Sequence, residues 1–167
     1  MPTYTIQIHN SKRDFELYYD DALAARMVYP KWHSANCIIE VGDEQYDLKG
    51  QGFWKRKYTL YLGEQEVASY VPGFGKCIIT PRMEAHHFYQ IKTRAFFKSG
   101  YKLMNYKDEP LAEFTYKVSW KKFRTLYEII LSKDIQPDAN MDFLALVLMV
   151  KYGIDIQKAA AAAAASS

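Results

Sequence analysis

Two short stretches of the chain combine positively charged and aromatic side chains in the same way. In each stretch a Trp comes directly before a run of Lys and Arg. Lys and Arg match phosphate oxygens through charge and hydrogen-bond donors, and Trp or Phe settles readily at a lipid headgroup boundary. The pattern therefore predicts a surface that binds an anion or an anionic lipid. The candidate residues are Lys55, Arg56 and Lys57 beside Trp54, and Lys121, Lys122 and Arg124 beside Trp120 and Phe123.

A third stretch, 92–98, has the same composition, but the chain as a whole is only mildly basic. Its formal net charge is +3 over 167 residues. Proteins that bind nucleic acid usually concentrate more positive charge on one face, so we expect no nucleic-acid partner. Solvated strands also carry Lys and Arg as a protection against edge-to-edge aggregation. The basic stretches therefore fit either an anion-binding surface or a solvent-exposed strand surface that binds no ligand, and both interpretations stay open.

Other residue types that could do chemistry lack the spacing that chemistry needs. Glu84 and His86 would share one face of a strand and could hold one metal ion together, but a zinc site needs a third ligand. A pair of histidines in a turn is the simpler interpretation of 84–87. Cys37 and Cys77 each precede Ile-Ile, which favours buried, reduced thiols. We expect no metal and no cofactor.

The sequence also lacks the motifs of a catalytic nucleophile and of a phosphate-binding loop. No Gly-x-Ser-x-Gly elbow is present. The stretch 72–76 (Pro-Gly-Phe-Gly-Lys) has glycines and a lysine but not the spacing of a P-loop, so we interpret it as a turn between strands. We therefore predict no catalytic residue and a protein that is not an enzyme.

Most of the chain alternates apolar and polar residues in short runs that are typical of half-buried strands. Gly, Pro, Asp and Asn separate the runs at intervals typical of antiparallel sandwiches and barrels, giving about eleven or twelve strands. The stretch 20–27 fits either a strand or a short helix. The other predicted strands are 4–8, 15–19, 37–41, 46–48, 53–62, 67–71, 76–80, 88–93, 101–106, 111–118 and 125–131.

One segment near the end, 142–152, has no polar side chain between Phe143 and Val150. It is too short to cross a membrane, which needs roughly 17–25 apolar residues. Asp and Asn residues at 138–142 offer helix N-caps, and Gly153 is expected to end the helix. A helix that is apolar all round must be surrounded on every side. The sequence therefore predicts a closed antiparallel barrel of about twelve strands that encloses this helix.

A chain of strands that ends in an apolar helix resembles the tubby C-terminal-like superfamily, which includes the LURP-one-related proteins and the phospholipid scramblases. The segment 142–152 and the strand order before it carry the resemblance, and the basic-aromatic stretch 53–68 is similar to the LURP-one-related pattern. The resemblance implies a twelve-strand barrel around a central hydrophobic helix. It assigns no phosphate ligand, because the terminal signature of the tubby proteins has no match here.

These observations predict one domain over 1–156 and a low-complexity Ala/Ser tail over 157–167. The N-terminus has no basic segment followed by a long apolar run, so we expect a cytoplasmic protein, with peripheral membrane contact as one option. The leading hypothesis is a non-enzymatic binding or scaffold module that engages an anionic phospholipid, such as a phosphoinositide, or a protein partner. The alternative is a barrel that carries a small apolar ligand, which would need a cavity of some 300 Å³ or more beside the helix.

Overall fold

The computed structural model of the protein describes residues 3–9, 13–31, 34–52, 57–93, 100–121 and 124–166, apart from the side chains of Val118 and Arg124. These residues form twelve strands followed by one helix. The strands are β1 (Tyr4–Ile8), β2 (Phe15–Tyr19), β3 (Ala22–Val28), β4 (Cys37–Val41), β5 (Glu44–Gln51), β6 (Lys57–Leu62), β7 (Gln65–Pro72), β8 (Lys76–Pro81), β9 (Tyr89–Thr93), β10 (Gly100–Met104), β11 (Pro110–Ser119) and β12 (Arg124–Leu131), and the helix is α1 (Met141–Ala165).

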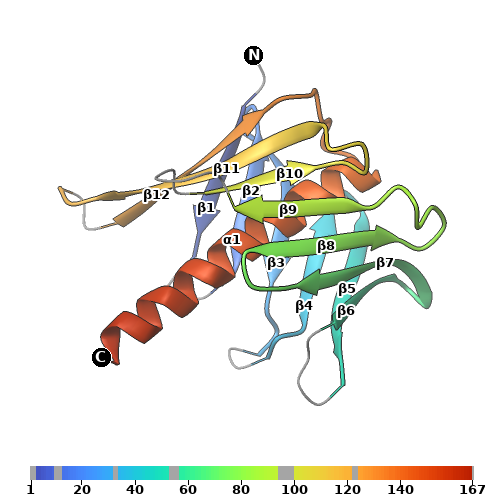
Figure 1. The fold of residues 1–167 in the computed structure, drawn as a ribbon, viewed down its shortest axis with the longest axis horizontal. Coiled ribbons are helices and arrows are strands. Elements are labelled where there is room, and N and C mark those ends of the chain that lie inside the picture. Colours follow the sequence, from blue (N-terminus) through green and yellow to red (C-terminus); the bar gives the residue numbers. More distant parts are fainter. Residues whose placement is uncertain are drawn as a thin grey trace.

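Each strand pairs antiparallel with the next one along the chain, so the sheet order is the sequence order from β1 to β12. The sheet curls until β1 contacts β12, which gives a nearly closed barrel (Figure 1). This arrangement needs only short connections, because consecutive antiparallel strands can be joined by tight turns. The predicted fold class is confirmed: a mostly β protein with an antiparallel barrel and one C-terminal helix.

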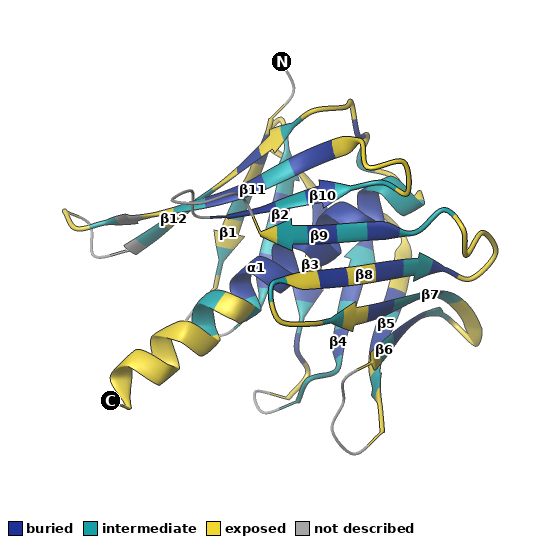
Figure 2. Cartoon of the chain, in the orientation of Figure 1, coloured by how far each residue is buried: buried dark blue, intermediate teal, exposed yellow. Residues whose placement is uncertain are grey.

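The first half of α1 runs inside the barrel (Figures 1 and 2). Every residue from Phe143 to Ile154 is buried, and most of them have no exposed surface at all. The strands supply the surrounding wall by alternation. In β4, for example, Cys37, Ile39 and Val41 are buried and the residues between them are partly exposed. The predicted burial of the apolar helix within the sheet is therefore confirmed.

The helix does not end at Gly153, as the sequence analysis expected, but continues to Ala165. Gly153 has a packing role instead. A Cβ atom at this position would lie 2.3 Å from Cε1 of Phe114 on β11, so only glycine lets the helix approach that ring. Lys151 is consequently not in the last turn of the helix. It is a buried residue in its middle.

The end of the helix leaves the barrel and is exposed from Ala159 onward (Figure 2). Within the described residues, no helix combines the length and the apolar character that a membrane crossing requires. The stretch 20–27, which fitted either a helix or a strand, belongs mostly to β3. Cys37 and Cys77 are both buried free thiols, as predicted.

Candidate functional site

The up-and-down topology sorts the connections of the barrel between its two ends. Each odd-numbered strand ends, and the next even-numbered strand begins, at the end where α1 emerges (Figure 1). Connections from an even-numbered strand to the next odd-numbered one lie at the opposite end, where α1 begins. We call the first the basic end and the second the acidic end, for the reasons that follow.

The acidic end collects carboxylates from every connection that reaches it. Each tight turn between an even-numbered strand and the next odd-numbered one contributes one or two, and the segment between β12 and α1 contributes more. All of them except Asp142 are exposed. They are Asp20, Asp21, Asp43, Glu44, Glu64, Glu66, Glu84, Asp108, Glu109, Asp134, Asp138 and Asp142.

Three of the six residues that the sequence analysis proposed as an anion site belong to the described chain, and these three lie at the basic end. Lys57 is the first residue of β6 and Lys121 follows β11, and both side chains are exposed. Arg124 begins β12. Lys55, Arg56 and Lys122 lie outside the described residues, as does the side chain of Arg124. Lys31 and Lys76 add two more exposed cations at the same end.

Two exposed aromatic side chains stand at turns of the basic end. Phe74 is at the tip of the β7–β8 turn and its side chain is fully exposed. The turn is closed by a 2.8 Å hydrogen bond from the backbone N–H of Gly73 to the carbonyl of Lys76, and Gly75 has a positive φ of 75°. The predicted turn at 72–76 is therefore confirmed. Trp120, between β11 and β12, is 80% exposed.

Among the described residues of the basic end, the carboxylates Asp14 and Asp155 are already engaged within the protein. Asp14 accepts a 2.9 Å hydrogen bond from the backbone N–H of Tyr29. Asp155 forms an ion pair with Lys151, one helical turn earlier. Their charges are therefore directed to internal partners, which leaves the exposed lysines to set the charge of this surface.

The Lys151–Asp155 pair lies at the point where the helix passes out of the barrel. Only 4% of the Lys151 side chain is exposed, against 28% for Asp155. The ammonium donates to the hydroxyl of Tyr29 at 2.9 Å. Its Nζ atom also lies 5.3 to 6.0 Å from the ring centres of Tyr29, Tyr58 and Tyr70, which is within the range of cation–π attraction.

Burial and charge act in opposite directions on this cluster. Burial alone would lower the pKa of Lys151, but the facing Asp155 carboxylate, helped by Tyr29 and Cys37, raises it above its usual range. Burial raises the pKa of the Cys37 thiol to about 11 and that of Cys77 to about 12. Lys151 is therefore charged at neutral pH and both cysteines are protonated, inert thiols.

A helix that ended at Gly153 would place Lys151 in its last turn, so the sequence analysis did not consider a pairing of Lys151 with Asp155. One signal was readable: Lys151 and Asp155 are four residues apart, a spacing that places two side chains together on a helix. The expected end of the helix at Gly153 hid that signal. The cluster anchors the helix within the barrel wall, because Tyr29 comes from the end of β3 and Tyr58 and Tyr70 come from β6 and β7.

The residues weighed as a metal site lie in the β8–β9 turn at the acidic end. Glu84 accepts from Nδ1 of His87 at 2.9 Å, and His87 stacks on Tyr106. The pairing of Glu84 with His86 that strand alternation suggested is therefore wrong, because these residues form a turn and not a strand. Within the described part of the chain, no group of three or more potential ligands could hold a metal ion.

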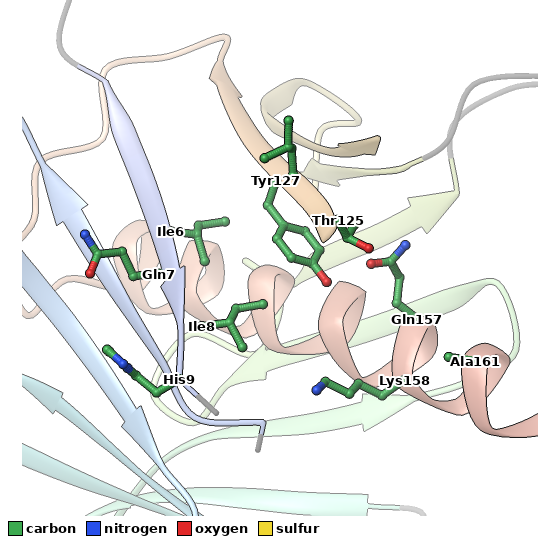
Figure 3. Close-up of a pocket in the computed structure, with 10 residues that line it drawn as sticks. Ile6, Gln7, Ile8, His9, Thr125, Tyr127, Gln157, Lys158 and Ala161 are labelled. Atoms are coloured by element: carbon green, nitrogen blue, oxygen red, sulfur yellow. The ribbon is translucent and has the colours of Figure 1, made fainter. Parts of the chain in front are cut away.

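A groove of about 870 Å³ runs along the seam between β1 and β12, beside the emerging helix (Figure 3). Its lining includes Ile6, Ile8, Tyr127 and Lys158. The barrel lumen, by contrast, is occupied by the side chains of α1. The hypothesis of an apolar ligand inside the lumen would require the helix to move, whereas the seam groove exceeds the size that such a ligand needs.

Comparisons with protein-family models, with curated proteins and with solved structures find no match to this chain. The resemblance to the tubby C-terminal-like superfamily therefore stays a prediction.

Proposed function

We propose that this protein is a non-enzymatic binding module that docks the basic end of its barrel onto an anionic phospholipid surface. The observation that carries the proposal is the separation of charge between the two ends. Exposed lysines and two exposed aromatic side chains occupy one end, and exposed carboxylates fill the connections at the other.

This separation favours one orientation at a negatively charged surface. Each Lys or Arg near an anionic membrane contributes about 1 kcal/mol of attraction. The carboxylates are repelled by the same surface, and they lie on the far end of the barrel (Figure 1). Lys31, Lys57, Lys76 and Lys121 would face the lipid together. The module therefore binds in a defined orientation although its net charge is small.

The exposed aromatic side chains supply the second part of the interaction. Phe74 and Trp120 stand at turns of the basic end, where they can enter the headgroup region without disturbing the core. A phenyl ring on a turn flanked by two glycines gains little from the folded protein itself. Insertion into the bilayer boundary removes its apolar surface from water.

Cosedimentation with vesicles tests the proposal. The full chain is mixed with vesicles of pure phosphatidylcholine, or with vesicles in which roughly one lipid in five is phosphatidylserine or a phosphoinositide. We expect binding only to the anionic vesicles, and release when salt rises from about 0.1 M to about 0.5 M. Equal binding to neutral and anionic vesicles, or none to either, would refute the proposal.

Paired variants locate the surface. Lys57→Gln with Lys121→Gln removes two charges from the basic end, so the free energy of binding should fall by about 2 kcal/mol, roughly thirtyfold in affinity. Lys107→Gln with Lys133→Gln makes the same change in net charge at the acidic end, and should leave binding nearly unchanged. If both pairs lose affinity equally, the attraction depends on net charge and not on the basic end.

The aromatic residues have a matched control as well. Phe74→Ser should weaken vesicle binding without affecting the melting temperature, because the ring is fully exposed. Met83 at the acidic end is 85% exposed, and Met83→Ser should change neither property.

A further inference from the structure

The acidic end of the barrel contains an apolar pocket of about 320 Å³. It lies between the start of α1 and the turns β4–β5, β6–β7 and β8–β9. Its apolar lining includes Leu62, Val67, Met83, Met141 and Leu144. Sites for small ligands span roughly 300–1,000 Å³. This pocket is at the lower limit of that range, so it has room for one aromatic side chain.

Carboxylates surround the mouth of this pocket. Glu44, Glu66 and Glu84 are exposed, and the lining includes no Lys or Arg of the described residues. Glu44 accepts a 2.7 Å hydrogen bond from the hydroxyl of Tyr46, a neutral group that leaves the charge of the carboxylate uncompensated. Glu66 and Glu84 each face one basic side chain of the same end, at 3.9 and 2.9 Å. A complementary occupant would therefore combine an apolar group with a nearby positive charge.

The β7–β8 turn, at the opposite end of the barrel, presents this combination (Figure 1). Phe74 at its tip is fully exposed, and Lys76 follows two residues later. Two hydrogen bonds fix the turn. The backbone N–H of Gly73 donates to the carbonyl of Lys76 at 2.8 Å, and the hydroxyl of Tyr152 on α1 donates to the carbonyl of Gly73 at 2.8 Å. Since the turn is already ordered, insertion of Phe74 into a pocket costs little conformational entropy.

Lys76 has no compensating charge on its own molecule within the described part of the chain. It lies directly opposite Lys92 in the register of β8 and β9, and like charges in that position repel each other. Lys92 is itself paired with Asp108 at 3.4 Å, whereas no described carboxylate forms an ion pair with Lys76. A carboxylate of another molecule would therefore offset this repulsion as well as form an ion pair.

We propose that the pocket binds the β7–β8 turn of a second copy of this chain, with Phe74 in its apolar interior and Lys76 against Glu44 and the other carboxylates of its mouth. An aromatic side chain in a preformed pocket is a typical anchor of a protein interface. A small apolar ligand is a poorer occupant, because it would leave these carboxylates without a countercharge. This assembly does not require lipid binding, although both use the basic end.

The contact joins two different surfaces, the basic end of one copy and the acidic end of the next. Each copy therefore keeps one free end of each kind, and such contacts repeat along a row of molecules. The emerging half of α1 leaves the barrel beside the β7–β8 turn, to which Tyr152 is bonded (Figure 1). Successive copies are consequently offset from one another, so that the next barrel lies beside the helix and not in its path.

Analytical ultracentrifugation of the full chain tests the proposal. The contact is small, so we expect the mean mass to rise above the 19.4 kDa of the monomer between about 10 μM and about 1 mM protein. It should fall again when salt rises from about 0.1 M to about 0.5 M. Phe74→Ser removes the inserted ring, and Ala139→Arg places bulk and positive charge at the pocket, where Ala139 is exposed. Each variant should weaken self-association by about tenfold or more.

A mixture of these two variants identifies the geometry. Phe74→Ser offers only an intact pocket and Ala139→Arg only an intact β7–β8 turn, so together they should form a one-to-one complex and nothing larger. Neither substitution should lower the melting temperature, because both residues are exposed. Ala139→Arg should also keep its affinity for anionic vesicles, which separates this proposal from the lipid-binding one.

Two control variants make the same changes away from the contact. Ile130→Ser removes an exposed apolar side chain from the outer face of β12, and Ala22→Arg adds an exposed cation at the acidic end outside the pocket. Both should associate like the native chain. A chain that is monomeric at every concentration, or a mixture of the two test variants that stays monomeric, would overturn the proposal. So would native mass spectrometry that shows a co-purified small molecule, absent from Ala139→Arg, because the pocket would then belong to that ligand.

Discussion

Removal of the Asp155 carboxylate should destabilise the protein far more than removal of the Lys151 ammonium that it faces. Asp155→Ala leaves a positive charge whose side chain is only 4% exposed. Lys151→Met instead leaves a carboxylate whose side chain is 28% exposed, although its Oδ1 atom is itself buried. The two variants break the same ion pair, so the difference between them isolates the cost of a stranded buried charge.

The surroundings of Lys151 set the expected size of the effect. Deleting one partner of a buried ion pair typically costs 3–5 kcal/mol. In Asp155→Ala the ammonium keeps its hydrogen bond to Tyr29 and its contacts with three tyrosine rings, so we expect about 3 kcal/mol, the low end of that range. Lys151→Met strands the less buried of the two charges and fills the space of the ammonium with an apolar chain, so we expect a smaller loss of about 1 kcal/mol, the low end of the cost of an unpaired buried polar group.

The difference in the free energy of unfolding between the two single variants should also depend on pH. In the native protein the pKa of Lys151 is raised, so its contribution to stability is present below the unfolded pKa of about 10.4 and is lost as the pH rises through the folded value. In Asp155→Ala the main remaining influence is burial, which lowers that pKa. The variant is then least stable near neutral pH, and its deficit should shrink between about pH 7 and about pH 10.

Urea unfolding followed by circular dichroism measures these free energies. We would compare the native chain, both single variants and the double variant Lys151→Met with Asp155→Ala at several pH values. The double variant should recover most of the stability that Asp155→Ala loses, because no charge is left stranded. Equal losses in the two single variants, or a deficit of Asp155→Ala that does not change with pH, would show that the ammonium is hydrated in the folded protein.

Two further predictions concern packing and the thiols. Gly153→Ala should lower the free energy of unfolding by about 1–3 kcal/mol, because the new Cβ would overlap the Phe114 ring. Without that overlap, helix propensity alone would raise the free energy of unfolding by about 1 kcal/mol. Urea unfolding gives the sign of the change, and a stabilised variant would contradict the described packing. Cys37 and Cys77 should not react with a thiol-specific disulfide reagent in the folded protein, since both are buried and their pKa values are raised to about 11 and about 12. They should react fully in denaturant, and rapid reaction of either one under native conditions would contradict the described burial.

The strands could be predicted from the sequence because their signals are local. Alternation between apolar and polar residues decides which face of a strand is buried, as in 37–41, and it needs only neighbouring residues. The apolar run from Phe143 to Val150 likewise demanded burial on all sides. These patterns led to the barrel and its central helix without any knowledge of how the strands are arranged in space.

The ends of elements were harder to predict, because a tertiary contact overrode local preference. Gly153 usually favours a helix end, yet the helix passes through it to pack against Phe114. Lys151 normally favours exposure, yet three tyrosine rings and Asp155 stabilise it inside the barrel wall. Neither outcome is visible in the residue itself, since each depends on partners far away in the sequence.

The sequence by itself determined which residues carry charge and which segments become strands. Only the tertiary structure decided where the charges gather, because alternating strand directions send successive connections to opposite ends of the barrel. The same closure decided that β1 and β12 meet as unpaired edges beside the emerging helix. A one-dimensional pattern records burial and charge, whereas proximity between distant residues arises only when the sheet curls around α1.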